Sequence, residues 1–218
     1  MNLLTKRLTK EFKLIFFDFD GVIKKSNEVK TQAFKKIFNK YGKDIVSKVV
    51  NHHLENLGVS RVKKISYCYS QFLKRPVNKN ELISLSNDFS KLVVDSVISS
   101  EYVSGSKEYL LENKYEQEFI LITGTPHDEI QFILKKLKIY DVFSKIFGSP
   151  NEKKAVVKQL LMERADIKPK TILIGDSRTD CDAAKSNNIP FAYRIDSYDN
   201  SKLMNESDYY LKNFSNLI

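Results

Sequence analysis

The sequence has few of the features that mark disulfide-rich, membrane-spanning or repetitive proteins. Its two cysteines, Cys68 and Cys181, are too few for a disulfide framework and lack the spacing of a zinc site, which favours a reduced, cytoplasmic protein. The apolar run Leu14 to Phe17 is too short for a signal sequence or a membrane span. The chain has no internal repeat, low-complexity segment or glycine-rich linker. We therefore expect a soluble, unprocessed protein with no membrane partner.

Positive charge is abundant but dispersed. The 36 Lys and Arg residues exceed the 27 Asp and Glu residues, which gives a formal net charge of +9. Such an excess would favour nucleic acid if it were gathered on one face. The lysines instead form separate pairs, such as 24–25 and 135–136, without interleaved aromatic residues that could stack on bases. We expect a solvated surface and no nucleic-acid partner, with nucleic-acid binding as the alternative that a salt-dependent mobility shift would test.

Short apolar runs alternate with amphipathic helical patterns after about residue 106. This alternation is typical of a parallel sheet wound by helices. The predicted strands are 14–18, 119–123, 145–148, 171–175, 191–195 and 209–211, and the predicted helices between them include 129–138 and 154–164. The expected fold class is α/β, with a doubly wound, Rossmann-like parallel sheet.

Residues 24–103 interrupt this alternation. They contain no convincing strand, and their apolar residues recur at helical spacing, for example over 29–41 and 82–97. A helical stretch of this length that begins and ends beside the end of one strand indicates a domain inserted into the first. We expect a Rossmann-like core of residues 1–23 and 104–218, with an all-helical insertion over 24–103.

Polar side chains stand at the ends of three predicted strands. Asp18 and Asp20 close the first, Thr123 ends the second, and Asp176 and Asp180 follow 171–175. In a doubly wound sheet, ligands bind beyond the carboxyl ends of the strands, so these groups are expected to meet. Clustered carboxylates repel one another unless a cation neutralises them, and oxygen ligands favour Mg²⁺.

Two further groups, Lys153 and the amide of Gly124, would complete an anion site together with Thr123. Lys153 offers a point positive charge, and Thr123 offers a hydroxyl donor beside the free amide of Gly124. Each signal is weak alone, because paired aspartates are often caps or turn residues. Their conjunction, each at the boundary of a predicted element, indicates one composite site.

Four segments resemble, in order, the four motifs of the haloacid dehalogenase superfamily. They read FDFDGVI, LITGT, EKKAVV and ILIGDSRTDCDAAKSNNI, and the resemblance covers essentially the whole chain. The helical insertion resembles the small, C1-type cap of that family. The resemblance is to the branch that contains phosphoglycolate phosphatases and β-phosphoglucomutases.

The resemblance implies a role for each matched residue. Asp18 resembles the nucleophile that forms an aspartyl phosphate and also ligates the metal. Asp20 resembles the general acid and base, with its backbone carbonyl on the metal. Thr123 and Lys153 resemble the groups that hold the phosphoryl oxygens. Asp176 resembles a metal ligand.

Two assignments stay open at this point. Asp180 resembles either a residue that holds the metal ligands in place or one that binds the metal directly in some members. Lys153 is preferred to Lys154 because the apolar pair Val156 and Val157 then falls at the usual offset.

The resemblance implies a Mg²⁺-dependent phosphatase that acts on a small phosphorylated metabolite such as a sugar phosphate. Dehalogenation is disfavoured because halide-removing members lack an acid at the position of Asp20. The alternatives are a phosphosugar mutase and a non-catalytic phospho-ligand sensor, although a sensor is expected to have lost one of the acids. Phosphonate cleavage is disfavoured because no cap lysine matches the one that such members use. The sequence does not specify the oligomeric state.

The insertion offers one hint about the substrate. Residues 58–61, GVSR, resemble the specificity loop of small-capped members, in which the arginine can reach a distal anion or a sugar oxygen. Arg61 is therefore a candidate substrate contact, with an ordinary surface arginine as the alternative. His52, His53 and Glu55 could line the same entrance.

Overall fold

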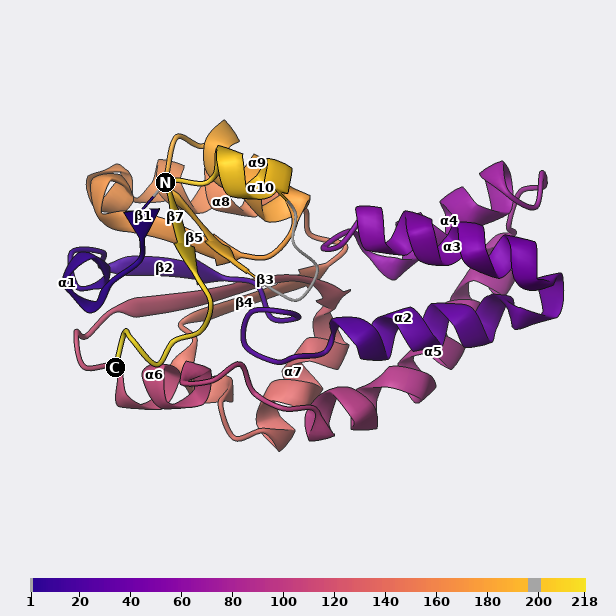
Figure 1. Cartoon of the computed structure of the whole chain (residues 1–218), viewed down its shortest axis with the longest axis horizontal. Helices are drawn as coiled ribbons and strands as arrows, with labels where there is room; N and C mark the ends of the chain where they lie inside the picture. The colour runs from indigo at the N-terminus through magenta and orange to yellow at the C-terminus, as the bar shows by residue number, and fades with distance from the viewer. Residues whose placement is uncertain (1, 196–200) are drawn as a thin grey trace.

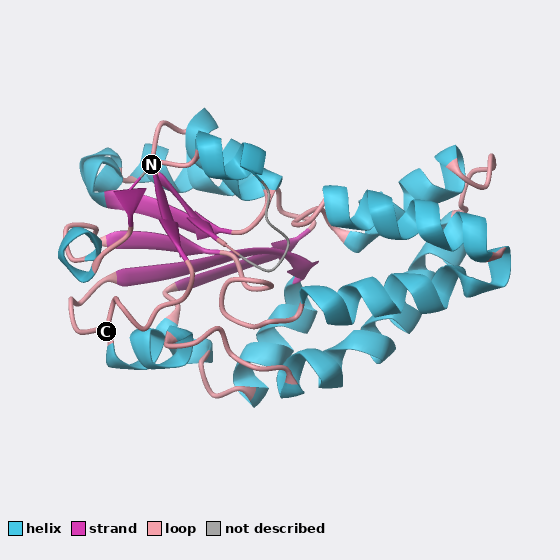
Figure 2. Ribbon diagram, viewed as in Figure 1, coloured by secondary structure: helices cyan, strands magenta, loops and turns pink. Residues whose placement is uncertain are grey.

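The computed structural model describes residues 2–195 and 201–218, which form a parallel sheet covered by helices and a separate group of helices (Figures 1 and 2). The strands are β1 (Asn2–Leu3), β2 (Leu14–Phe17), β3 (Glu118–Pro126), β4 (Lys145–Ser149), β5 (Thr171–Gly175), β6 (Phe191–Arg194) and β7 (Tyr209–Leu211). Their spatial order is β1-β7-β6-β5-β2-β3-β4, and every pairing is parallel.

Strand β2 lies where the strand order reverses. Its last residue, Phe17, is in register with Leu121 of β3 on one side and with Ile174 of β5 on the other. The carboxyl ends of these three strands therefore meet at one edge of the sheet, which is where a doubly wound fold binds its ligands. The α/β fold expected from the sequence is confirmed.

Alternate side chains of β2 enter different cores. Ile15 and Phe17 join one cluster of buried apolar residues, whereas Leu14 and Phe16 join the other. The two clusters lie on opposite faces because successive strand side chains alternate. The first face is covered by α6 (Ser106–Glu112) and α7 (His127–Lys136), and the second by α8 (Lys153–Glu163) and α9 (Arg178–Ser186) (Figure 1). The remaining helices of the core are α1 (Lys6–Thr9), α10 (Ser201–Glu206) and the short 3₁₀ segments η2 (Tyr140–Val142) and η3 (Ala165–Lys170).

Four α-helices extend from the edge at which the strands end (Figure 1). They are α2 (Asn27–Phe38), α3 (Lys43–Glu55), α4 (Arg61–Gln71) and α5 (Lys79–Ser99), with the 3₁₀ segment η1 (Asn39–Tyr41) after α2. We call them the helical insertion. Its two connections run side by side: the Lys25 amide donates to the Glu101 carbonyl at 2.9 Å, and the Val103 amide donates to the Ile23 carbonyl at 2.9 Å. That the insertion forms a domain of its own over 24–103 stays a prediction.

The observed elements differ from the expected ones mainly at their ends. Strand β3 continues to Pro126 because its ladder with β4 resumes at Ser149 after an irregularity. Helix α7 begins at His127, two residues before its expected start. Strand β1 was not predicted, since it is two exposed residues with no apolar pattern. Within the described ranges, no helix combines the length and apolar character that crossing a membrane requires.

Candidate active site

The chain turns sharply after β2. Gly21 has a φ of 74°, and a Cβ at this position would lie 1.9 Å from Oδ2 of Asp176. Only glycine combines this backbone conformation with so close an approach. The turn leaves Asp18 and Asp20 at the carboxyl end of the central strand, where the Asp18 amide still donates to the Ile174 carbonyl of β5 at 3.0 Å.

Asp18 is buried and paired with the first residue of α8. Its Oδ2 lies 2.7 Å from Nζ of Lys153, and its Oδ1 accepts from the Phe19 amide at 2.7 Å. Nζ of Lys153 also lies 2.7 Å from Oδ1 of Asp180, so one ammonium group bridges two carboxylates. Lys154 is exposed. Of the two candidate lysines, the geometry favours Lys153 as the site residue.

A third carboxylate, that of Asp176, joins this cluster. Oxygen atoms of Asp18, Asp176 and Asp180 lie within 4.8 Å of one another. Burial raises the pKa of Asp18 to about 6, against the opposing charge of Lys153. Burial, followed by the charges of Asp18 and Asp180, raises the pKa of Asp176 well above its usual value. Three carboxyl groups around one ammonium group resist full ionisation, and a divalent cation with oxygen ligands would relieve this repulsion.

Asp180 already has protein partners for both of its oxygens. Oδ1 accepts from Lys153, and Oδ2 accepts from the amide of Ser177 at 3.2 Å and from its hydroxyl. This is a capping box at the start of α9. Asp180 thus holds Lys153 and the loop after β5 in place. This favours a supporting role over direct binding of a metal. Asp176 accepts from Nδ2 of Asn27 at 2.7 Å.

Asp20 has a different environment from Asp18. Its Oδ1 accepts from the Ser26 hydroxyl at 2.6 Å, and its Oδ2 accepts from the Thr125 hydroxyl at 3.1 Å and forms an ion pair with Lys30 of α2. Burial alone would raise the pKa of Asp20, but the charge of Lys30 and the three hydrogen bonds outweigh it and hold the pKa below its usual value. The two acids, two residues apart, are therefore shifted in opposite directions.

Thr123 and Gly124 lie in β3, next to β2. Thr123 is buried, and its hydroxyl accepts from the Thr125 amide at 3.3 Å. A Cβ on Gly124 would lie 2.5 Å from the carbonyl oxygen of Gly58, in the loop between α3 and α4. A Cβ on Gly58, whose φ is 81°, would lie 2.1 Å from Oγ1 of Thr179. The loop of the insertion thus rests directly on the core.

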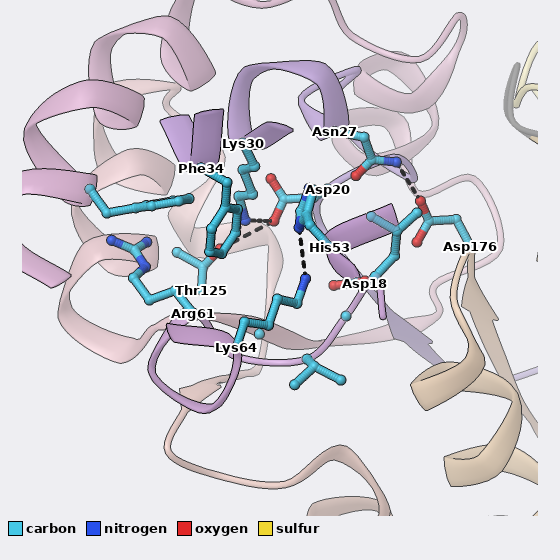
Figure 3. Close-up of a pocket in the computed structure, with 15 residues that line it drawn as sticks. Asp18, Asp20, Asn27, Lys30, Phe34, His53, Arg61, Lys64, Thr125 and Asp176 are labelled. Atoms are coloured by element: carbon cyan, nitrogen blue, oxygen red, sulfur yellow. Dashed lines mark hydrogen bonds and ion pairs between the residues drawn. The ribbon is translucent and has the colours of Figure 1, made fainter. Parts of the chain in front are cut away.

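Two cavities flank this loop. The inner cavity, about 40 Å³, is bordered by Asp18, Asp20 and Asp176 from the core and by residues of the insertion (Figure 3). The side cavity, about 280 Å³, is bordered by Thr123 and Lys153, and Gly124 lines both cavities. The inner cavity has room for a few water molecules at most. A substrate would enter it only after the insertion moves away from the core.

Arg61 lines the inner cavity but is committed to other partners. It is buried, forms an ion pair with Glu129 of α7, and donates to the Ser90 hydroxyl of α5 at 2.8 Å. Its guanidinium also lies over the Phe89 ring, 4.5 Å from the centroid. It is therefore not an ordinary surface arginine. Its role as a substrate contact stays a prediction.

Of the three residues expected near the entrance, only His53 lines the inner cavity. His52 stacks on Tyr67 with ring centroids 4.0 Å apart, and Glu55 is exposed. Nδ1 of His53 lies 2.9 Å from Nζ of Lys64, which is also buried. Burial, followed by the charge of Lys30, lowers the pKa of Lys64 to about 7.

Sequence reasoning missed five polar groups of this site: Ser26, Asn27, Lys30, Lys64 and Thr125. Lysine pairs are so frequent in this chain that nothing in the sequence distinguishes a buried lysine from a solvated one. Thr125 carried a usable signal, since it lies two residues after Thr123 and so shares its face of the strand.

Comparison with known proteins agrees with this geometry. The family model of haloacid dehalogenase-like hydrolases matches residues 15–193. The chain belongs to this family. A search of the curated proteins found no match.

Solved structures of the same fold come from several bacteria. A predicted phosphoglycolate phosphatase from Haemophilus somnus is 17% identical, with a TM-score of 0.70 over 94% of this chain and 96% of that one. A β-phosphoglucomutase from Clostridium difficile is 20% identical, with a TM-score of 0.71 over 95% and 93%. A HAD-hydrolase from Bacillus subtilis, bound to magnesium, is 13% identical, with a TM-score of 0.69 over 94% and 96%. At these identities the likeness shows the fold alone.

Proposed function

We propose that this protein is a Mg²⁺-dependent phosphatase that hydrolyses a small phosphate monoester through an aspartyl phosphate on Asp18. One observation carries the proposal: Asp18 is held against Lys153 at the end of the central strand, while Asp20, two residues later, has its own hydrogen-bonded environment. Without metal or substrate the pKa shifts run opposite to these roles, since the pKa of Asp18 is raised by burial and that of Asp20 is lowered by Lys30; bound Mg²⁺ would lower the pKa of Asp18. The family match supports hydrolytic chemistry.

The residues present fit a magnesium ion. The buried cluster places three carboxyl groups close together and offers hard oxygen ligands. Asp18, Asp176 and the backbone carbonyl of Asp20 would hold the ion. When bound, Mg²⁺ would neutralise the repulsion between the Asp18 carboxylate and the incoming phosphate.

In the first step, a carboxylate oxygen of Asp18 attacks phosphorus, and the bond from phosphorus to the ester oxygen breaks. Asp20 donates a proton to the departing oxygen. Thr123, the Gly124 amide and Lys153 would hold the phosphoryl oxygens. The negative charge of the ester would compete with Asp20 for Lys30. The pKa of Asp20 would then rise, which favours its protonated form.

In the second step, Asp20 takes a proton from water, and the hydroxide oxygen attacks the phosphorus of the aspartyl phosphate. The acyl phosphate bond breaks, which regenerates the Asp18 carboxylate and releases inorganic phosphate. Ser26 and Thr125 donate to Asp20 and so orient its carboxylate for this step.

A phosphomutase is a second candidate, favoured by the closed inner cavity. A mutase must protect its aspartyl phosphate from water until an acceptor hydroxyl arrives, and a cavity of about 40 Å³ holds little water. A purely ligand-binding role is disfavoured because Asp18, Asp20, Asp176 and Lys153 are all present and buried.

The test is phosphate release from a panel of phosphorylated metabolites with and without Mg²⁺, with Asp18→Asn protein as the control. We expect Mg²⁺-dependent release by the native protein only. Conversion of one sugar phosphate into its isomer, without phosphate release, would identify a mutase instead. Equal release by the native and Asp18→Asn proteins would contradict both the phosphatase and the phosphomutase proposals.

A further inference from the structure

Asn27 of the insertion reaches a carboxyl group of the core. It is the first residue of α2, and its Nδ2 donates to Oδ2 of Asp176 at 2.7 Å, with both side chains buried (Figure 3). Asp18 and Asp180, the other members of the carboxylate cluster, are held by Lys153 and by amide or hydroxyl groups of the core. One carboxyl group of the proposed metal site is therefore held from outside the core.

The turn after β2 gives this hydrogen bond a fixed place. Gly21 lies in the turn, and a Cβ there would come within 1.9 Å of Oδ2 of Asp176 and 2.4 Å of Nδ2 of Asn27. Both polar groups thus lie against the Cα atom of Gly21, in space that a side chain would otherwise fill. The backbone of the core encloses the contact, which distinguishes it from a chance meeting of two surface side chains.

The side chains at the start of α2 are directed at the core. Ser26 stands at the N-cap, where a serine hydroxyl commonly accepts a hydrogen bond from an amide of the first turn. Its side chain makes no such bond and donates instead to Oδ1 of Asp20 at 2.6 Å. Two successive residues of the insertion, Ser26 and Asn27, thus hold two acids of the site, which favours a role in the site over a role in capping the helix.

An amide group is suited to orient a metal ligand. Lys153 forms ion pairs with Asp18 and Asp180, whereas Asp176 accepts from the neutral amide of Asn27. A neutral partner orients the carboxyl group but does not compete with a cation for its charge. A carboxylate offers about four lone-pair sites, so one hydrogen bond leaves the others for a metal. Such partners fix the orientation of a ligand, and their loss typically weakens metal binding by about tenfold to a hundredfold.

We infer that Asn27 is a positioning residue for the metal, which holds Asp176 in the orientation that binds Mg²⁺. The metal site is then completed by the insertion and is not formed by the core alone. This inference rests on the proposed function, because it takes Asp176 as a ligand of the ion. It does not depend on which ester is the substrate.

The test is calorimetric titration of substrate-free protein with Mg²⁺. Asn27→Leu keeps a side chain of similar size that cannot donate, and Asn27→Ala repeats the test with a smaller one. We expect the dissociation constant for Mg²⁺ to rise roughly tenfold to a hundredfold in both. The increase in the midpoint of thermal unfolding that Mg²⁺ causes should shrink as well. A merely structural loss would lower the midpoint equally with and without Mg²⁺, and that result would overturn the inference.

Thr31→Val is the matched control. Thr31 is one turn further along α2, is also buried, and its hydroxyl donates to the backbone carbonyl of Asn27 at 3.1 Å. The substitution removes a hydrogen bond of α2 and leaves the side-chain contact with Asp176 in place, so the affinity for Mg²⁺ should not change. If Thr31→Val weakened Mg²⁺ binding as much as Asn27→Leu, the packing of α2 would be responsible and the inference would fail.

A double substitution separates positioning from direct binding of the metal. If Asn27 acts only through Asp176, adding Asn27→Leu to Asp176→Ala should weaken Mg²⁺ binding little further. A further loss as large as in the single variant would make Asn27 a ligand itself and overturn the inference.

The same titrations keep this inference apart from the proposed hydrolysis. Mg²⁺ binding that depends on Asn27 supports the inference even if no ester is hydrolysed, an outcome that would overturn only the hydrolysis. Equal Mg²⁺ affinity of the native and Asn27→Leu proteins would overturn the inference and leave the hydrolysis standing. Native protein that does not bind Mg²⁺ would overturn both.

Discussion

Nζ of Lys30 lies between the carboxylate of Asp20, with which it forms an ion pair, and the hydroxyl of Thr125, to which it donates at 2.8 Å. Lys30 belongs to α2 of the insertion, whereas Asp20 and Thr125 belong to the core. The proton affinity of the proposed general acid therefore depends on a residue of the insertion.

Replacing Lys30 should change the pH dependence of the reaction. Lys30 lowers the pKa of Asp20, and a general acid works only while it is protonated. Lys30→Met should therefore shift the alkaline limb of kcat/KM for an alkyl phosphate to higher pH, by about one to three units. Lys30→Arg, which keeps the charge, serves as the control. An unshifted limb in Lys30→Met protein would argue against Asp20 as the acid.

Asp18→Asn should abolish turnover and stabilise the metal-free protein at alkaline pH. Burial raises the pKa of Asp18 from 3.8 to about 6, so its protonated form favours the folded state and this contribution is lost as the pH rises through 6. The amide does not titrate. The stability gain over the native protein should be on the order of 2–3 kcal/mol at pH 8 and should shrink towards pH 4. Urea unfolding at both pH values measures it; a gain independent of pH contradicts the explanation.

Asp20→Asn should separate substrates by their leaving groups. Alkyl phosphates need a proton on the departing oxygen, while an activated aryl phosphate needs little. The loss of kcat should therefore be far larger for the alkyl ester, typically about 10² to 10⁴-fold for a missing general acid. Single-turnover rates for the two ester classes provide the comparison, and an equal loss for both would assign Asp20 another role.

Metal binding should be visible in stability as well as activity. Mg²⁺ should raise the midpoint of thermal unfolding of the native protein, because it neutralises the buried carboxylates, and should restore activity after chelation. Ca²⁺ should bind but inhibit, since its larger coordination sphere misplaces the nucleophile. Asp176→Asn should weaken the Mg²⁺ response. Undiminished activity after exhaustive chelation would rule out the proposed site.

Gly58→Ala should prevent the loop of the insertion from closing. The added Cβ would meet Oγ1 of Thr179 at 2.1 Å and Oγ of Ser177 at 2.4 Å. Gly42→Ala is a matched control, because its φ of 88° is equally unfavourable for alanine but no atom lies within 4 Å of the added Cβ. Both should lose about 1 kcal/mol of stability to backbone strain. Only Gly58→Ala should lose kcat/KM, by tenfold or more; an equal loss in both would mean that strain alone is responsible.

The parallel sheet could be predicted from the sequence because its central strands are short runs of apolar residues between helical patterns. Residues 171–175 illustrate this: all five are buried, and the observed strand has the expected bounds. The ends of β3 and the strand β1 depend on pairing with distant segments, which periodicity along the chain does not record.

The candidate site was predictable only where a residue closes a strand or opens a helix. Asp18, Asp176 and Lys153 stand at such boundaries, and the structure brings them together. Lys30 and Lys64 lie within helices, and they come near the carboxylates of the core only when the insertion packs on the core. Helical spacing gives no sign of such a contact, because it depends on how two distant parts of the chain meet.

The connections at Ile23 to Lys25 and Glu101 to Val103 are joined by two backbone hydrogen bonds, so we expect a movement of the insertion to turn about this pair as an axis. Lys30 lies in the first turns of α2, close to this axis, whereas the Gly58 loop contacts the core at Gly124 and leads into α4, which contains Lys64. A swing about the axis would displace the loop and Lys64 far more than Lys30. Ligands could then enter and leave beside the Gly58 loop. Lys30, which lowers the pKa of Asp20, would stay near the axis and keep its position beside Asp20 in each cycle.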